Sequence, residues 1–172
     1  FSKSVLNLSQ ANNKELPNQE EFLRQMTQKN DLYKEYISAM VPEDVLPGSI
    51  ALLEKLHEKG VKNAIASASK NTPLVLEKTG LIKYIDEVAD GNQITHSKPD
   101  PEVFLLAASK CLCDPSHCVG IEDAESGVEA IQRAKMKSIG VGEQGKKADI
   151  VVNSVQELTY EKIKALLNDT QQ

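Results

Sequence analysis

The chain has 172 residues, of which 40% are hydrophobic, 26% charged and 4% aromatic. This length suits one compact domain with a small appendage and is sufficient to bury a hydrophobic core. Lysine and arginine number 20 and acidic residues 25, which gives a formal net charge of -5. A mildly acidic chain with interspersed charges lacks the basic surface of a nucleic-acid-binding protein, and no apolar run approaches the ~18 residues of a membrane span.

The cysteines indicate the compartment. The chain has three of them, an odd number, and Cys111 and Cys113 are too close in sequence to be natural disulfide partners. Small secreted domains usually carry an even set of cysteines. The chain also begins at Phe1 without a signal-peptide pattern, so we expect a reduced, cytoplasmic protein.

Two regions of different pattern meet at a turn-rich stretch, residues 41–48 (Val-Pro-Glu-Asp-Val-Leu-Pro-Gly). Ahead of it, side chains recur at alternating steps of four and three, which predicts one stripe of a long helix. Asn18, followed by Glu20 and Glu21, is a candidate N-cap with acidic residues in the first turn. The stripe consists of Phe22, Met26, Lys29, Tyr33, Tyr36 and Met40.

After the turn the pattern alternates between helices and strands. A helix around Leu53 is predicted to stop at Gly60, a favourable residue just past a helix end. Strands separated by helices need crossover connections and therefore pair in parallel, so the sequence predicts an α/β doubly wound parallel sheet with a helical appendage in front. Strands are expected at 63–68, 86–89, 117–121, 137–141 and 149–152, and further helices at 72–78, after 100–101, at 125–134 and at 160–167.

Three polar clusters follow predicted strands, where open parallel sheets bind their ligands. The first is 66–71 (Ala-Ser-Ala-Ser-Lys-Asn), between a strand and a helix. Its hydroxyls, its lysine and the free N–H groups of the helix form a candidate anion site. An ordinary strand–helix turn with an N-cap serine explains the same residues, and the residues alone leave both interpretations open.

The second and third clusters carry charged side chains. In 97–101 (Ser-Lys-Pro-Asp-Pro), Lys98 stands just before a helix, although a lone lysine in a loop is more often a surface residue. In 120–127 (Gly-Ile-Glu-Asp-Ala-Glu-Ser-Gly), a strand runs directly into Glu122 and Asp123. Such a carboxylate pair suits a hard cation such as Mg²⁺, whereas N-capping by Asp123 and a helix-dipole role for Glu125 would need no ligand.

The three clusters together resemble motifs II, III and IV of the haloacid dehalogenase superfamily. Residues 66–71, 97–101 and 120–124 resemble its β-phosphoglucomutase branch in particular, as do Lys29-Asn30 and residues 42–48. The resemblance is strong from about Lys29 to Val152 and weak outside this range. It implies a Rossmann-like haloacid dehalogenase core with an N-terminal helical cap.

The activity implied by the resemblance is Mg²⁺-dependent conversion of β-glucose 1-phosphate to glucose 6-phosphate, through an aspartyl-phosphate and a bisphosphorylated intermediate. Ser67 would donate hydrogen bonds to the transferring phosphoryl group, with the Ala68 N–H beside it. Lys98 would balance the negative charge of nucleophile and phosphate. Asp123 would ligate Mg²⁺, with Glu122 as its neighbour at the metal site.

Other residues would hold the substrate. By the same resemblance, Ser69, Lys70 and Asn71 would bind the second, non-reacting phosphate. Lys29 provides an independent argument, because a charge within an apolar stripe is costly to bury. Either its ammonium extends to water, or its helix face covers a polar active site as in a mobile cap; in the second case Asn30 would help to read the sugar or the distal phosphate.

One family motif is missing from this sequence. The superfamily's apolar strand followed by Asp-x-Asp, which supplies the nucleophile, is not found, and an Arg that binds the distal phosphate is not seen at its expected place near Phe1-Ser2. We therefore expect residues 1–41 to be part of a truncated helical cap and residues 42–172 to be an α/β core lacking its first strand. On this view the chain alone is inactive.

Three functions remain in competition. The first is a mutase of carbohydrate metabolism that acts on a sugar phosphate and is a monomer when complete, with no nucleic-acid or membrane partner. The second is a sugar-phosphate phosphatase of the same superfamily. The third, which follows if the chain is complete, is a catalytically inactive phosphosugar-binding protein. Residues 69–71 favour the mutase, because a simple phosphatase needs no second phosphate site.

Overall fold

The computed structural model describes residues 19–168, and the chain divides into two compact units, Phe1–Met40 and Val41–Gln172. In the first unit, helix α2 (Gln19–Ser38) forms over the range with the four–three spacing, whereas the candidate cap Asn18 lies outside the described residues. Of the expected stripe, Lys29, Tyr33 and Tyr36 are exposed and Met26 and Met40 are half-buried. Tyr33 is 43% and Tyr36 66% exposed, while Ile37 is only 1% exposed. Ile37, which the predicted stripe omits, is thus the buried residue of α2 among the side chains that the structure describes.

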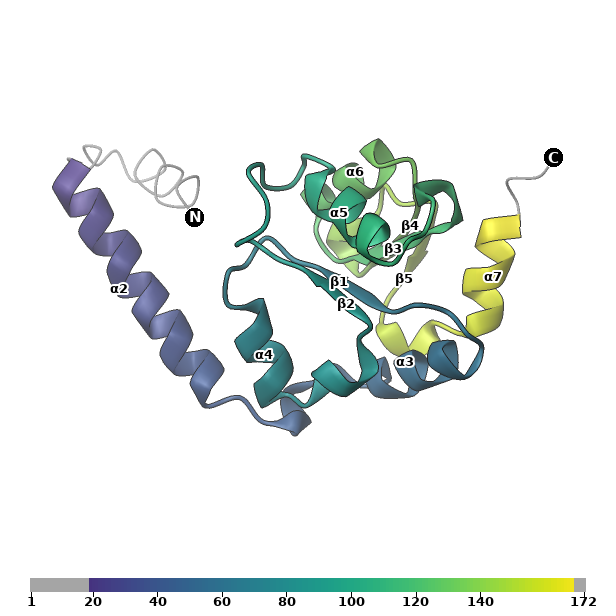
Figure 1. The fold of residues 1–172 in the computed structure, drawn as a ribbon, viewed down its shortest axis with the longest axis horizontal. Helices are drawn as coiled ribbons and strands as arrows, with labels where there is room; N and C mark the ends of the chain where they lie inside the picture. Colours follow the sequence, from purple (N-terminus) through teal and green to yellow (C-terminus); the bar gives the residue numbers. More distant parts are fainter. Residues whose placement is uncertain (1–18, 169–172) are drawn as a thin grey trace. The chain divides into compact units, whose positions relative to one another are not determined.

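The second unit alternates helices and strands as the sequence predicts (Figure 1). Helix α4 and strand β4 have the predicted bounds, and the others differ from prediction by a few residues. Gly60 follows α3 in a left-handed conformation, with φ of 74°, as expected at a helix end. The elements are α3 (Ser49–Glu58), β1 (Ala64–Ala66), α4 (Thr72–Lys78), β2 (Glu87–Ala89), α5 (Glu102–Lys110), β3 (Val119–Glu122), α6 (Glu125–Arg133), β4 (Lys137–Val141), β5 (Ile150–Val152) and α7 (Tyr160–Asn168).

All strand pairs are parallel, but they form two sheets. Strand β1 pairs with β2, with Ile65 opposite Val88. Strand β4 pairs with β3 on one side and with β5 on the other, with Ile139 opposite both Ile121 and Ile150. Within residues 19–168, β1 and β3 are therefore both edge strands. The α/β fold with parallel pairing is confirmed, whereas one continuous sheet is not observed, and the expected absence of a first strand stays a prediction.

Helices pack on both faces of the strands (Figure 1). Helix α5 packs on β1 and β2, α6 packs on β3 and β4, and the two helices contact each other. One core cluster lies among them and includes Ala89, Val103 and Ile131. A second cluster joins α3 and α7 to β4 and β5 and includes Leu52 and Ile139. Ala66, at the carboxyl end of β1, packs against the first cluster.

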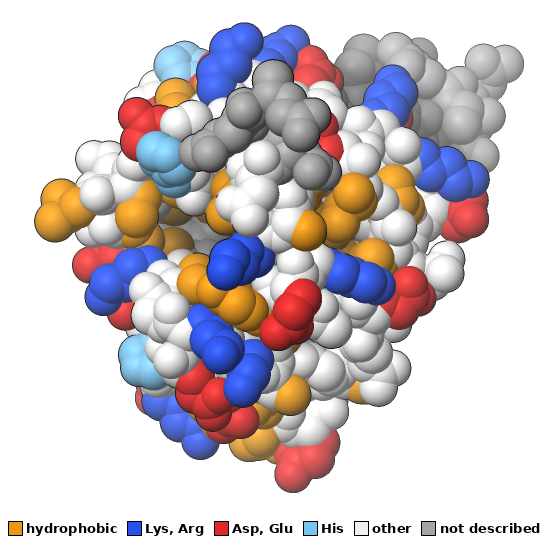
Figure 2. Space-filling model, turned by 90° about the vertical axis from the view of Figure 1, so that its right-hand side faces the viewer, with side chains coloured by type: hydrophobic (Ala, Val, Ile, Leu, Met, Phe, Trp, Pro, Cys, Tyr) orange, Lys and Arg blue, Asp and Glu red, His pale blue; other side chains and the backbone are white. Residues whose placement is uncertain are grey.

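The surface agrees with the mixed charge of the sequence. Figure 2 shows one face of the molecule, on which basic and acidic side chains intermingle. Among the helices of residues 19–168, none combines the length and the apolar character needed to cross a bilayer.

The packing of α6 gives a stability prediction. Ile131 is fully buried, and its side chain fills the space beside Gly120, where an added Cβ would lie 2.5 Å from Ile131 Cγ1. Ile131→Ala should lower the free energy of unfolding by about 2–5 kcal/mol, because it removes buried methyl groups and leaves a cavity. Urea unfolding followed by circular dichroism measures this change.

The matched control is Ile82→Ala, the same truncation at a side chain that is 50% exposed. It should cost less than about 1 kcal/mol. Equal losses in the two variants would contradict the position of Ile131 in the core.

Candidate active site

The loop after β1 is organised by its own hydroxyl groups. The Ser67 N–H donates to the Ala89 carbonyl at 3.0 Å. Ser67 Oγ accepts the Ser69 N–H at 3.1 Å, and Ser69 Oγ accepts the Asn71 N–H at 3.2 Å. A hydroxyl that accepts a hydrogen bond keeps its own hydrogen to donate. The turn interpretation is therefore correct for the local hydrogen bonds, but its N-cap serine is wrong, because the N-cap residue of α4 is Asn71 and makes no side-chain cap bond. Both serine hydroxyls stay able to donate to an anion.

The segment after β2 supports this loop. The Gly91 N–H donates to the Ser69 carbonyl at 3.2 Å, and Asn92 Nδ2 donates to the Lys70 carbonyl at 3.1 Å. A Cβ at Gly91 would lie 2.3 Å from the Ala68 carbonyl oxygen, so only glycine permits this approach. The sequence reasoning did not include these residues; an isolated glycine after a predicted strand is the signal that could have drawn attention to them.

Lys98 is not a surface lysine. Its side chain is 17% exposed and pairs with Glu122, whose side chain is 11% exposed. The ammonium also lies 4.8 Å from the centre of the Phe104 ring, a distance at which a cation and an aromatic face attract each other. The two residues stand 24 positions apart in the sequence and meet beyond the carboxyl end of β3.

Glu122 is held at the beginning of α6. Its Oε2 accepts the Asp123 N–H at 3.1 Å and the Ala124 N–H at 3.3 Å. A Cβ at Gly127 would lie 2.2 Å from Glu122 Cδ, so the carboxylate fits there only because residue 127 has no side chain. The Lys98 ammonium and the N–H groups at the beginning of α6 thus both hydrogen-bond this carboxylate.

Asp123 does not act as the helix cap. The residue at the N-cap of α6 is Ala124, which makes no side-chain cap bond. Within residues 19–168 no hydrogen bond to the Asp123 carboxylate is found, and this residue is exposed. Glu125 instead pairs with Lys147, whose hydrogen bond lowers the pKa of the Glu125 carboxyl. The capping interpretation of Asp123 is therefore wrong, and its oxygens are accessible beside Glu122.

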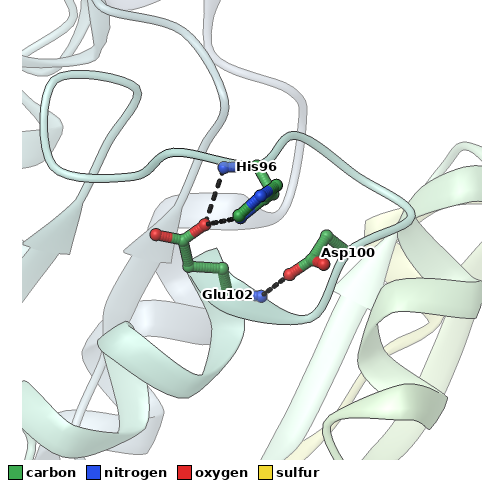
Figure 3. A group of neighbouring side chains, drawn as sticks. All are labelled: His96, Asp100 and Glu102. Carbon is green, nitrogen blue, oxygen red and sulfur yellow. Dashed lines mark hydrogen bonds and ion pairs between the residues drawn. The ribbon is translucent and has the colours of Figure 1, made fainter.

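The first residue of α5, Glu102, is a carboxylate that the sequence reasoning missed (Figure 3). Glu102 Oε1 accepts the Thr95 N–H at 2.9 Å, and Oε2 accepts the His96 N–H at 2.6 Å and lies 3.0 Å from His96 Nδ1. The two backbone N–H groups lower the pKa of the Glu102 carboxyl. Asp100 Oδ1 in turn accepts the Glu102 N–H at 2.9 Å. An acidic residue in the first turn of a predicted helix was the available signal.

The structure brings some of the predicted site residues together. Lys98, Glu122 and Asp123 form one group at the carboxyl end of β3. Residues 67–71 form a second group after β1, and no hydrogen bond or ion pair among residues 19–168 joins the two groups. Lys29 and Asn30 are exposed on α2, in the other unit. The functional roles of all these residues stay predictions.

Comparison with known sequences identifies relatives. The chain matches the haloacid dehalogenase-like hydrolase family over residues 3–141. The beta-phosphoglucomutase of Bacillus subtilis is 40% identical over 139 residues, which cover 79% of this chain and 61% of the relative. A phosphorylated carbohydrates phosphatase of Thermotoga maritima is 33% identical over 108 residues, or 62% of this chain and 49% of the relative. The chain thus spans only 49–61% of these two relatives.

Solved structures agree with this assignment. A beta-phosphoglucomutase from Clostridium difficile superposes with a TM-score of 0.85 at 35% identity, covering 96% of this chain and 77% of that chain. A HAD hydrolase from Entamoeba histolytica has a TM-score of 0.75 at 21% identity, covering 94% of this chain and 77% of that chain, which supports the fold alone. The chain belongs to the haloacid dehalogenase-like hydrolase family.

Proposed function

We propose that the protein is a Mg²⁺-dependent phosphoryl-transfer enzyme that interconverts β-glucose 1-phosphate and glucose 6-phosphate. The observation that carries the proposal is the Lys98–Glu122 pair beside the accessible carboxylate of Asp123, at the carboxyl end of β3. A sequence relative and a structural neighbour are both named beta-phosphoglucomutase, at 40% and 35% identity, which supports the choice of substrate.

The described residues would act mainly by position and charge, as phosphoryl transfer requires. The bond between phosphorus and the C1 oxygen breaks while a bond to the acceptor oxygen forms, and negative charge spreads over the three other phosphoryl oxygens. The Ser67 hydroxyl and the Ala68 N–H would donate hydrogen bonds to these oxygens. The Lys98 ammonium, shielded from water, would neutralise negative charge shared by the phosphoryl group and the nucleophile. No residue of this chain is assigned as that nucleophile.

The carboxylates at the end of β3 fit a magnesium ion. Mg²⁺ prefers oxygen ligands and is usually held by one or two carboxylates together with substrate phosphate. Asp123 offers accessible oxygens, and Glu122 is adjacent. These two residues would hold the ion, which when bound supplies further charge neutralisation at the phosphoryl group.

A mutase must also hold the phosphate that does not react. Ser69, Lys70 and Asn71 would do this, with the Lys70 backbone fixed by Asn92. Lys29 and Asn30 of α2 would help to read the sugar or its distal phosphate. Sugar-phosphate hydrolysis is the second candidate, because relatives at 33% and 34% identity are named phosphorylated carbohydrates phosphatase and hexitol phosphatase B.

One assay separates the two candidates. The purified protein that carries this chain is incubated with β-glucose 1-phosphate, Mg²⁺ and catalytic glucose 1,6-bisphosphate, and both glucose 6-phosphate and inorganic phosphate are measured. The mutase produces glucose 6-phosphate without matching release of phosphate. Release of phosphate in place of glucose 6-phosphate would contradict the mutase and establish the phosphatase.

Lys98→Ala should reduce turnover about 100-fold or more, because it removes the cation that balances charge in the transition state. The same assay measures the loss as kcat. Lys55→Ala is the control, since Lys55 forms an exposed ion pair with Glu58 on α3 and its loss should leave kcat unchanged. Near-normal turnover in Lys98→Ala would refute the role given to this residue.

Removal of divalent cations with EDTA should abolish turnover, and added Mg²⁺ should restore it. Asp123→Asn should raise the Mg²⁺ concentration for half-maximal activity at least about tenfold, because an amide is a weaker ligand than a carboxylate. Magnesium titrations of kcat for the wild type and the variant test this. Activity that persists in EDTA, or an unchanged titration in Asp123→Asn, would argue against this metal site.

A further inference from the structure

We propose that Glu102 is a positioning residue that fixes the Lys98 ammonium in place by clamping the loop ahead of α5. The inference rests on the proposed function of Lys98 in phosphoryl transfer. Glu102 itself touches neither Lys98 nor the carboxylates of the β3 end in any of its hydrogen bonds. Its effect on the reaction would therefore be indirect.

The clamp closes on the first half of the loop (Figure 3). The two oxygens of Glu102 accept the consecutive N–H groups of Thr95 and His96, at 2.9 and 2.6 Å. The His96 ring adds a third contact at 3.0 Å. Hydrogen bonds from N–H groups to an ionised carboxylate are stronger than those between neutral groups. The backbone two residues before Lys98 is thus tied to the first residue of α5.

The second half of the loop is tied to the same point. Asp100 Oδ1 accepts the Glu102 N–H at 2.9 Å, and the Asp100 N–H donates to the Ser97 carbonyl at 3.1 Å. Lys98 therefore lies between two anchored positions, residues 96 and 100. Both anchors converge on Glu102.

The anchor point is joined directly to the hydrophobic core. Glu102 is followed directly by Val103 and Phe104, which are buried in the core cluster of α5 and α6. The Phe104 ring also lies beneath the Lys98 ammonium, at 4.8 Å. The first turn of α5 thus provides both the clamp for the loop and the surface on which the lysine rests.

The same three side chains could be mistaken for a cation site. Ligand atoms of His96, Asp100 and Glu102 lie within 4.8 Å of one another. However, both oxygens of Glu102 accept backbone N–H groups, and Asp100 Oδ1 accepts another. The observed bonds account for the cluster as a loop clamp, so no metal is assigned to it.

The charge of Glu102 gives the clamp a pH dependence. Hydrogen bonds from the Thr95 and His96 N–H groups lower the pKa of its carboxyl, and His96 and Asp100 are the titratable side chains that face it. Because this pKa is lowered, the hydrogen bonds of the clamp stabilise the folded protein fully above the pKa of an ordinary glutamate. This stabilisation is lost as the pH falls through the lowered pKa of Glu102.

The test follows the lysine directly by NMR. Lysine carbons are labelled with ¹³C, and the Lys98 ε-CH₂ signal is assigned by its disappearance in Lys98→Ala. In Glu102→Ala this signal should move toward that of exposed lysines. In Glu102→Gln it should move less, because the amide oxygen can still accept one of the two N–H groups. In the unmodified protein it should also shift over the acid range in which Glu102 titrates, and this part of the shift should be absent in Glu102→Gln.

Asp114→Asn is the matched control. Asp114 is also a carboxylate in a loop that accepts a backbone N–H and a second local hydrogen bond, both from Ser116, and these lower its pKa. It precedes β3 in sequence, whereas Lys98 meets Glu122 beyond the other end of that strand. The Lys98 signal should not move in Asp114→Asn.

Kinetics provide the second readout. Glu102→Ala should lower kcat by up to about 100-fold with KM within about twofold, because a misplaced group stabilises the transition state less. The kcat of Glu102→Gln should lie between the values for Glu102→Ala and the wild type. A role in stability alone would lower the unfolding midpoint without this graded loss of kcat in the folded variants.

Each outcome is decisive. An unmoved Lys98 signal in folded Glu102→Ala and Glu102→Gln overturns the positioning role. If Glu102→Ala does not fold, the test rests on Glu102→Gln and on the pH titration of the unmodified protein. A Lys98 signal that moves neither in Glu102→Gln nor with pH again overturns the positioning role. If the Lys98 signal moves as expected but the wild type transfers no phosphoryl group, the proposed function fails while the clamp stands.

Discussion

The ion pair between Lys98 and Glu122 is the interaction on which the site depends. Both side chains are mostly shielded from water, and an unpaired charge at such a position would be strongly destabilising. Lys98 precedes α5, which packs on β1 and β2, whereas Glu122 ends β3 in the other sheet. Among the described residues no backbone ladder joins β1 to β3. The ion pair therefore joins the loop ahead of α5 to the end of β3, at the edge where the candidate site lies.

Two close approaches allow this arrangement. Gly127 leaves room for the Glu122 carboxylate at the beginning of α6, and Gly91 leaves room for the Ala68 carbonyl in the loop after β1. An added Cβ at Gly91 would overlap backbone atoms of the loop, and one at Gly127 would displace the Glu122 carboxylate from its place. The polar residues of the site thus require glycine at positions that bear no chemistry themselves.

Much of the fold could be predicted from the sequence because its signals are local. Helix α4 and strand β4 have the predicted bounds, since apolar periodicity and flanking residues define them. The burial of Lys98 could not be predicted, because it depends on Glu122, 24 residues further along. Glu102 was missed for a similar reason: its partners are backbone groups of Thr95 and His96, which leave no side-chain pattern. The stripe on α2 was misplaced because Tyr33 and Tyr36 fit the spacing as apolar residues, although both are exposed.

Family membership does not by itself separate a mutase from a phosphatase. The cation at Lys98, the hydroxyl at Ser67 and the carboxylate at Asp123 would stabilise the same charge whether the attacking oxygen belongs to a sugar or to water. The acceptor is selected instead by groups that hold the substrate and exclude water. Among the described residues, 69–71 are the candidates for selecting the acceptor. They lie next to Ser67, on a loop whose Ser69 and Lys70 carbonyls accept hydrogen bonds from Gly91 and Asn92. A loop held in this way can present a second phosphate site beside Ser67, which a mutase would use and a phosphatase of simple monophosphates would not need.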